Sequence, residues 1–251
     1  MYAHNLPMQL ARPRFSAAAL VTLALLSAAC SDTASRINSP PLHSSSSNGS
    51  SVAPSNFAVL ANAAVTCTDG TITGNVGTFF ATPTGSVTQT TCPITGAIQL
   101  GDGVAQQAFT DFLGTYTALA PKLGDVCTTL TGTLDGMALP PGAYCFDVAA
   151  TVTGVLTLDG PSDGIWTFKI GTSGTGALTG TGFSVVMAGG GQACNVTWWV
   201  ADAVTMTGSA FQGNILAGVA ITLTGGTLNG HASSRSDVTI TGTAVTACEG
   251  S

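Results

Sequence analysis

A short repeated pattern constrains the fold of this chain more than any other feature of its sequence. The pattern covers twelve positions: an apolar-Thr-apolar-Thr segment, a three-residue gap, and an apolar-polar-Gly segment that ends in two further residues. It occupies residues 204–215, returns seventeen residues later at 221–232, and stands far upstream at 65–76. A truncated copy follows at residues 238–246. A short fixed period is typical of a solenoid, in which each unit buries its apolar side against its neighbours.

Side chains alternate within each unit of this pattern, as they do along a β-strand. The first and third positions are apolar in every copy, which predicts that they point into a shared core. The second and fourth positions are Thr in every copy, which predicts that they point outward. Turn residues follow, so each unit has room for three short strands. The sequence therefore predicts a mostly β fold, a discontinuous triangular β-solenoid whose upstream copy docks beside the last ones.

One segment has helical rather than strand periodicity. Apolar residues recur at positions 104, 105, 108, 109, 112, 116 and 119, which predicts one long α-helix over residues 104–120. Asp102 is placed to cap its start, and Pro121 explains where it ends. Because a single amphipathic helix needs an apolar partner, we expect it to pack along the side of the solenoid. Looser strands are predicted at 142–148, 152–158, 164–170, 183–187 and 195–200.

The N-terminal residues predict export. Arg12 and Arg14 precede an apolar run over residues 15–26, which is too short for a stable membrane span. The run ends Leu26-Ser27-Ala28-Ala29-Cys30, which resembles a bacterial lipoprotein box except that Ser27 stands where that pattern has Leu. Two interpretations stay open. Either Cys30 is lipidated and anchors the chain at the cell surface, or ordinary signal cleavage before Cys30 releases the protein.

Composition divides the chain further and excludes one class of partner. Residues 1–30 are predicted to be the signal peptide, 31–54 a flexible tether rich in Ser, Asn and Pro, and 55–251 the folded domain. Only 7% of all residues are charged, the net charge is −6, and the six basic residues form no cluster. A nucleic-acid partner is therefore not expected. The 45% hydrophobic content argues against disorder of the domain.

The remaining cysteines favour disulfides over a metal site. They are Cys67, Cys92, Cys127, Cys145, Cys194 and Cys248. An even number in an exported chain is typical of a disulfide framework, although six cysteines allow fifteen pairings. The nearest-neighbour guess joins them in sequence order, two by two. No two have the C-x-x-C spacing and no His lies close to one, so we expect no metal and no cofactor.

Residues that might support catalysis are dispersed. The acids considered, which fall in caps and turns and do not recur in register, are Asp102, Asp111, Asp135, Asp159, Asp163, Asp202 and Asp237. A polysaccharide-cleaving β-helix enzyme needs converging carboxylates or a calcium site, so no enzymatic activity is expected. His231 is a lone histidine, for which we expect a surface position. Of Trp198 and Trp199 we expect at most one to be exposed.

Six further stretches are characteristic: Asn56-Phe57-Ala58-Val59-Leu60, Gly142-Ala143-Tyr144, Leu156-Thr157-Leu158-Asp159, Trp166-Thr167-Phe168-Lys169-Ile170, Ala193-Cys194-Asn195-Val196 and Phe211-Gln212-Gly213-Asn214-Ile215-Leu216-Ala217. In these stretches the chain resembles the bacterial and fungal ice-binding protein family, and the resemblance covers residues 56–248. It implies a discontinuous solenoid with an accompanying helix, and ice as the ligand. It also implies a Thr-[Ala/Gly]-x-[Thr/Asn] motif, which Thr224-Gly225-Gly226-Thr227 matches. The stretches at 207–210 and 241–244 depart from the motif at its last position.

Stacked coils turn the outward Thr pairs into a lattice. The predicted ice-binding residues are Thr66, Thr68, Thr205, Thr207, Thr222, Thr224, Thr227, Thr239 and Thr241. A Thr methyl disfavours disordered water, its hydroxyl donates and accepts hydrogen bonds, and its branched Cβ restricts the rotamer before any ligand arrives. Thr is also a common outward strand residue that supports sheets without a ligand, so the residues alone leave both interpretations open.

A second outward surface is predicted to be chemically mixed and a poorer match to ice. It would display Thr73, Asn75, Gln212, Asn214, Asn229 and His231. The third side would carry solvated Arg235 and Asp237. The prediction is therefore a monomeric, exported ice-binding protein with a flat Thr-rich surface. The alternative is a cell-surface adhesion or carbohydrate-binding module on the same scaffold.

Overall fold

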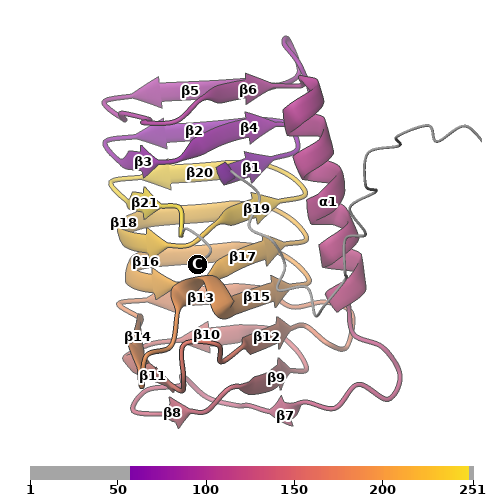
Figure 1. Cartoon of the computed structure of the whole chain (residues 1–251), viewed down its shortest axis with the longest axis vertical. Coiled ribbons are helices and arrows are strands. Elements are labelled where there is room, and N and C mark those ends of the chain that lie inside the picture. Colours follow the sequence, from indigo (N-terminus) through magenta and orange to yellow (C-terminus); the bar gives the residue numbers. More distant parts are fainter. Residues whose placement is uncertain (1–56, 249–251) are drawn as a thin grey trace, which may run out of the picture. The chain divides into compact units, whose positions relative to one another are not determined.

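The computed structural model describes residues 57–248, which form a three-sided stack of parallel strands with one helix along its side (Figure 1). This architecture confirms the predicted β-solenoid with a flanking helix. The predicted signal peptide, the tether and Cys30 lie outside the described residues. Each turn of the chain passes through a helix-covered face, then a Thr face, then a third face.

The helix-covered face is a nine-stranded sheet in which every neighbouring pair is parallel. Its strands, in spatial order, are β6 (Ile98–Leu100), β4 (Asn75–Thr78), β1 (Phe57–Ala61), β19 (Ala232–Ser234), β17 (Asn214–Ala217), β15 (Val196–Val200), β12 (Trp166–Ile170), β9 (Gly142–Phe146) and β7 (Thr128–Thr129). A short 3-10 helix, η1 (Ala193–Asn195), leads into β15.

The Thr face is formed by strands that directly follow those of the helix-covered face along the chain. They are β5 (Ser86–Thr90), β2 (Ala64–Thr68), β20 (Val238–Thr241), the first half of β18 (Ile221–Asn229), the first half of β16 (Val204–Gln212), β13 (Leu178–Thr181) and β10 (Ala150–Val152). The third face is formed by β3 (Thr71–Thr73), β21 (Ala244–Thr246), the second halves of β18 and β16, β14 (Ser184–Ala188), β11 (Val155–Asp159) and β8 (Ala138–Leu139).

The stack is assembled out of sequence order. Strands β1 to β6 build the coils at one end, α1 (Gly103–Leu119) runs along the stack, and the later strands return from the other end (Figure 1). The two parts meet at a seam, where Val65 pairs with Val238 and Thr66 with Thr239. The seam confirms that the upstream copy of the repeat docks beside the last one.

The interior is filled by inward side chains, among them a continuous aromatic column. The rings of Phe168 and Trp198 stack with centroids 3.9 Å apart, Tyr144 lies 5.3 Å beyond Phe168, and Phe211 lies 4.9 Å beyond Trp198. Trp198 is fully buried and its indole N–H donates to the carbonyl of Gln212 at 3.0 Å. Such contacts add to the burial energy of the large side chains, because stacked and edge-on rings attract each other.

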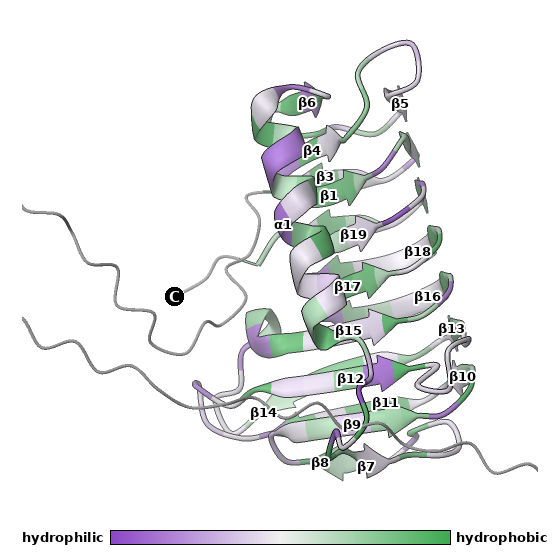
Figure 2. Cartoon of the chain, turned by 90° about the vertical axis from the view of Figure 1, so that its right-hand side faces the viewer, coloured by the Kyte–Doolittle hydropathy of each residue, from purple (hydrophilic) through white to green (hydrophobic). Residues whose placement is uncertain are grey.

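The helix forms and docks as its sequence predicts. Asp102 is the N-cap, and its carboxylate accepts the main-chain N–H of Ala105 at 2.8 Å. The buried face of the helix, which includes Phe109, Phe112 and Tyr116, packs on outward side chains of the helix-covered face. Figure 2 shows the helix lying against the strands from β4 to β15. Trp199 is therefore buried under the helix, so neither of the two consecutive tryptophans is exposed.

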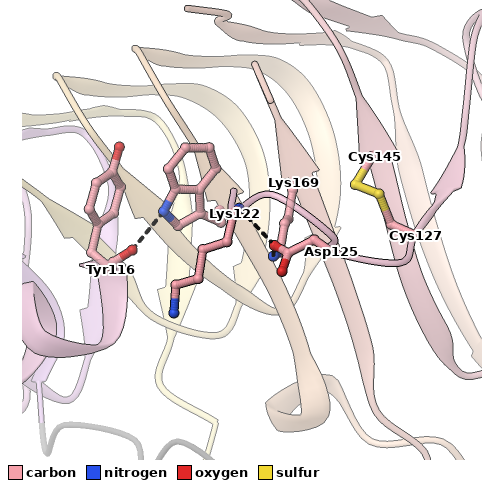
Figure 3. Close-up of polar contacts among 7 residues, drawn as sticks. Tyr116, Lys122, Asp125, Cys127, Cys145 and Lys169 are labelled. Carbon is pink, nitrogen blue, oxygen red and sulfur yellow. Dashed lines mark hydrogen bonds and ion pairs between the residues drawn. A yellow bond between two sulfur atoms is a disulfide. The ribbon is translucent and has the colours of Figure 1, made fainter. Parts of the chain in front are cut away.

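The C-terminal end of the helix is fixed by several contacts (Figure 3). The indole N–H of Trp199 donates to the carbonyl of Tyr116 at 2.9 Å.

Beyond the helix, Lys169 and Asp125 form an ion pair at 2.7 Å. The hydrogen bond from the Lys169 ammonium lowers the pKa of the exposed Asp125 carboxyl below its usual value. Any stability from this pair is thus present above the ordinary pKa of Asp and is lost as the pH falls through the lowered one.

Three disulfides join the cysteines in the nearest-neighbour order. They are Cys67–Cys92, Cys127–Cys145 and Cys194–Cys248. None of the three links residues 57–100 to the rest of the described chain, so the seam is closed by non-covalent contacts alone.

His231 corrects a sequence expectation, because it is 5% exposed rather than at the surface. Its Nδ1 lies 2.7 Å from the carbonyl oxygen of Phe57, where β1 begins. Its Nε2 lies 3.1 Å from the carbonyl oxygen of Cys248, the last described residue. His231 therefore holds both ends of the domain at one corner, which joins the third face to the helix-covered face and does not border the Thr face.

Removing this side chain should destabilise the domain. In a His231→Ala variant the carbonyl oxygen that accepts from the imidazole N–H loses its donor and the imidazole leaves a void, so we expect the free energy of unfolding to fall by about 1–3 kcal/mol. Urea unfolding followed by tryptophan fluorescence measures the change, with exposed Thr246→Ala as the control. A loss no larger than that of the control would show that this corner is not fastened by His231.

No helix within residues 57–248 combines the length and the apolar character needed to cross a membrane.

Candidate functional site

The Thr pairs of successive coils align into two straight columns on the Thr face. Strand pairing places the members of each column side by side. The first column is Thr88, Thr66, Thr239, Thr222, Thr205, Thr179 and Thr151. The second column is Thr90, Thr68, Thr241, Thr224, Thr207 and Thr181.

The spacing of these columns follows from β geometry. Neighbouring strands lie about 4.8 Å apart and alternate residues along a strand about 6.6 Å apart, so seven coils give an array about 29 Å long. Inward residues such as Val204 and Met206 are buried, while Thr205 and Thr207, which alternate with them along the strand, are exposed. The parallel register keeps the Thr positions in step from β5 to β10, so the array is regular in both directions.

A third column of small side chains borders the first. It consists of the residues two positions before the first Thr of each strand: Ser86, Ala64, Asp237, Ala220, Ala203, Ala177 and Ala149. Main-chain hydrogen bonds align its members; for example, Val204 N donates to Ala220 O at 2.9 Å and Ile221 N donates to Asp237 O at 3.0 Å. Asp237 thus lies at the margin of the Thr face. This corrects the sequence-based expectation, which placed it on a separate, solvated side of the coil together with Arg235.

Glycines turn the chain sharply at the other margin. Gly208 and Gly242 have φ values of 57° and 62°, in the left-handed region that favours glycine. Buried hydroxyls hold these turns: Ser209 Oγ donates to Thr207 O at 3.2 Å, and Thr243 Oγ1 donates to Gly225 O at 3.0 Å. No side chain rises from these glycines, whereas the turns after β2 and β5 carry exposed Asp69 and Thr91 at the same margin, with φ values of 52° and 51°.

The hydroxyl groups of the columns are available to a ligand. Within residues 57–248, none of these thirteen hydroxyls forms a hydrogen bond with another protein group. Each can therefore donate and accept toward water. Nine of the thirteen side chains are exposed, and Thr66, Thr68, Thr222 and Thr239 are half-buried.

The other described surfaces are less regular. The third face mixes small, amide and hydroxyl side chains, and the exposed Asn229 donates to Gln212 Oε1 at 3.0 Å. A hollow of about 500 Å³ lies at the β7 end of the stack, lined by residues 129–133 and 146–151, so it reaches Ala149 and Thr151 in the last coil of the Thr face. Phe80 is the single large aromatic counted as exposed in the described chain, at 40%. No three His, Cys, Asp or Glu side chains gather within residues 57–248 in a way that could hold a metal ion.

Comparison with known proteins places the chain in a family. The sequence pattern of the ice-binding-like family matches residues 59–246, which is most of the chain. The chain belongs to the ice-binding-like family.

Solved structures of ice-binding proteins share the fold. The chain is 32% identical to an ice-binding protein from the Antarctic ascomycete Antarctomyces psychrotrophicus, over 76% of this chain and 94% of that one, with a TM-score of 0.69. It is 26% identical to an ice-binding protein domain of Shewanella frigidimarina (78% and 98% covered, TM-score 0.69). It is 27% identical to an ice-binding protein with antifreeze activity from an Arctic yeast (79% and 96% covered, TM-score 0.68). No curated protein sequence matches the chain.

The structure brings together eight of the nine predicted ice-binding threonines. The ninth, Thr227, lies beyond the Gly225–Gly226 turn on the third face, paired with Ala210 and Ala244. Five members of the array escaped the sequence pattern: Thr88, Thr90, Thr151, Thr179 and Thr181. The x-Thr-x-Thr spacing of Val87-Thr88-Gln89-Thr90, Ala150-Thr151-Val152-Thr153 and Leu178-Thr179-Gly180-Thr181 would have revealed all five.

Proposed function

We propose that this member of the ice-binding-like family adsorbs to ice through the Thr face. The observation that carries the proposal is the pair of columns described above, whose thirteen exposed or half-exposed threonines repeat at a constant spacing. A crystal plane offers a ligand that repeats in two directions, so a regular array engages it at many points at once. Each contact is weak, but the rigid array loses little entropy on binding, so the contacts accumulate.

The chemistry of the Thr face suits ordered water better than a sugar or an ion. Methyl and hydroxyl groups alternate on it, and β-branching restricts each side chain to few rotamers. Carbohydrate recognition generally uses exposed aromatic rings, whereas Trp198 and Trp199 are both buried. The same surface offers no converging carboxylates for hydrolytic chemistry, so the proposed function is non-enzymatic.

In the cell, we propose, the protein is exported as a single chain and acts on extracellular ice. It would inhibit ice growth or recrystallisation, or hold the cell near ice if Cys30 is lipidated. Cys30 and the predicted signal peptide lie outside the described residues, so lipidation is tested separately, by mass spectrometry of the protein from a bacterial envelope. An unmodified mature N-terminus would exclude the anchored form.

An ice recrystallisation assay on the purified protein tests the proposal directly. We expect ice grains held just below the melting point to stay small in its presence and to coarsen in a buffer with heat-unfolded protein. Grain growth equal in both samples would contradict ice binding. Binding to immobilised glycans without any effect on ice would instead support the adhesion or carbohydrate-binding alternative.

A further inference from the structure

The three columns of the Thr face contain one charged side chain among the described residues, that of Asp237. It stands in the third column, between Ala64 and Ala220 of the neighbouring coils, and it is exposed. At the same position the other coils place Ala or Ser. Within the three columns, a carboxylate is therefore the one strongly hydrated group among methyls and neutral hydroxyls; the exposed Asp69 lies outside them, in the turn after Thr68 at the opposite margin.

Asp237 has a structural task that explains its presence there. Its Oδ1 accepts the main-chain N–H of Ala64 at 2.9 Å, across the seam between the first and the last coils. The adjacent main-chain hydrogen bond from Asn62 N to Ser236 O, at 2.8 Å, crosses the same seam. No disulfide spans this seam, so the carboxylate adds one polar link to the strand pairs β2–β20, β1–β19 and β3–β21 that hold the two parts in register.

The same group opposes adsorption to ice. Ice contains no counter-ion to pair with a carboxylate, and a charge that loses part of its hydration without a partner carries a large energetic cost. The single N–H donor of Ala64 compensates one oxygen of the carboxylate. The remaining oxygen keeps its water shell, which separates this margin of the face from a flat crystal plane.

We propose that Asp237 closes the seam and, by its charge, limits the strength with which the Thr face binds ice. This inference rests on the proposed function and adds to it one residue that sets affinity. The two roles of Asp237 are separable, because Asn offers an acceptor oxygen of the same shape without the charge. The neutral isostere should keep the seam closed and let the margin approach the crystal.

The experiment compares Asp237→Asn with the unchanged protein. We expect Asp237→Asn to halt recrystallisation at a protein concentration about threefold lower, a factor typical of removing one modest unfavourable interaction. The urea unfolding midpoint should stay close to that of the unchanged protein. Asp163→Asn is the matched control: it removes an exposed acid from the turn between β11 and β12, away from the Thr face, and should not change potency.

A second variant, Asp237→Ala, keeps the face neutral but gives up the acceptor for Ala64. We expect it to unfold at lower urea concentration than Asp237→Asn while it remains equally potent when folded. If Asp237→Asn is folded and no more potent than the unchanged protein, the charge does not limit binding and this inference is wrong, although ice binding itself stands. If neither Asp237→Asn nor the unchanged protein affects ice, both the inference and the proposed function fail.

Discussion

Replacing Thr222 or Thr224 with Tyr is expected to remove most of the effect on ice. Both residues lie near the centre of the array, on β18, with coils on either side. A ring that projects from a level surface keeps a crystal plane away from several neighbouring threonines at once. We expect about tenfold more protein to be needed to stop recrystallisation, the factor that corresponds to a loss of about 1.4 kcal/mol of adsorption energy.

The matched control for these variants is Thr73→Tyr. Thr73 is an exposed Thr on β3 of the third face, so this change adds the same bulk away from the two columns. All three variants should unfold within about 0.5 kcal/mol of the unchanged protein, as surface substitutions generally do. If Thr73→Tyr abolishes activity while Thr222→Tyr preserves it, the third face rather than the Thr face contacts ice.

The largest effect on stability is expected where the helix meets the stack. Trp199 is 4% exposed, stacks on the ring of Tyr116 with centroids 5.1 Å apart and donates a hydrogen bond to the helix. A Trp199→Ala variant loses these contacts and opens a cavity under the helix, so its free energy of unfolding should fall by about 3–5 kcal/mol. Urea unfolding monitored by circular dichroism measures the difference.

Val104→Ala provides the comparison for this prediction. Val104 lies in the first turn of the same helix but is 57% exposed, so truncating it should change stability by no more than about 0.5 kcal/mol. A Trp199→Ala variant that unfolds like Val104→Ala would mean that the helix does not stabilise the stack. Where Trp199→Ala remains folded it should still inhibit recrystallisation, because the helix and the Thr face lie on different sides.

Much of the architecture is predictable from the repeat because strand alternation is periodic. Apolar and Thr positions alternate without exception at 65–68, 204–207, 221–224 and 238–241, and these stretches form adjacent strands in register. The helix was equally predictable from the sequence, since its apolar spacing, its Asp102 cap and Pro121 all indicate the same helix bounds. Local sequence and fold are consistent in these segments, which is the condition under which prediction succeeds.

Four of the five additional threonines, at positions 88, 90, 179 and 181, were missed because their inward neighbours break the alternation. Gly180 stands where an apolar residue is expected, and a Cβ there would lie 2.3 Å from the sulfur of Met206, which fills that space from the next coil. Gln89 occupies the corresponding inward position in β5, the terminal strand, where no further coil covers it. Whether Met206 fills the space beside Gly180, and whether a further coil covers Gln89, depends on three-dimensional packing. Neither can be read from the sequence of a single strand.

Asn214 and His231 were misplaced for a different physical reason. Each follows a glycine, Gly213 or Gly230, whose φ of 111° or 154° turns the chain from the third face to the helix-covered face. Counting alternation through the turn assigns the next residue to the wrong side. Asn214 is instead 9% exposed and donates to the carbonyl of Cys194 at 2.8 Å.

The position of the two domain ends decides how the molecule can be displayed. Phe57 and Cys248 both lie beside His231. This is the edge of the three-sided stack where the third face meets the helix-covered face, and it does not border the threonine columns. Whatever polypeptide precedes or follows the domain must depart from that rear edge. A bulky cargo or an immobilising support joined close to Phe57 or Cys248 is therefore expected to leave the Thr face accessible.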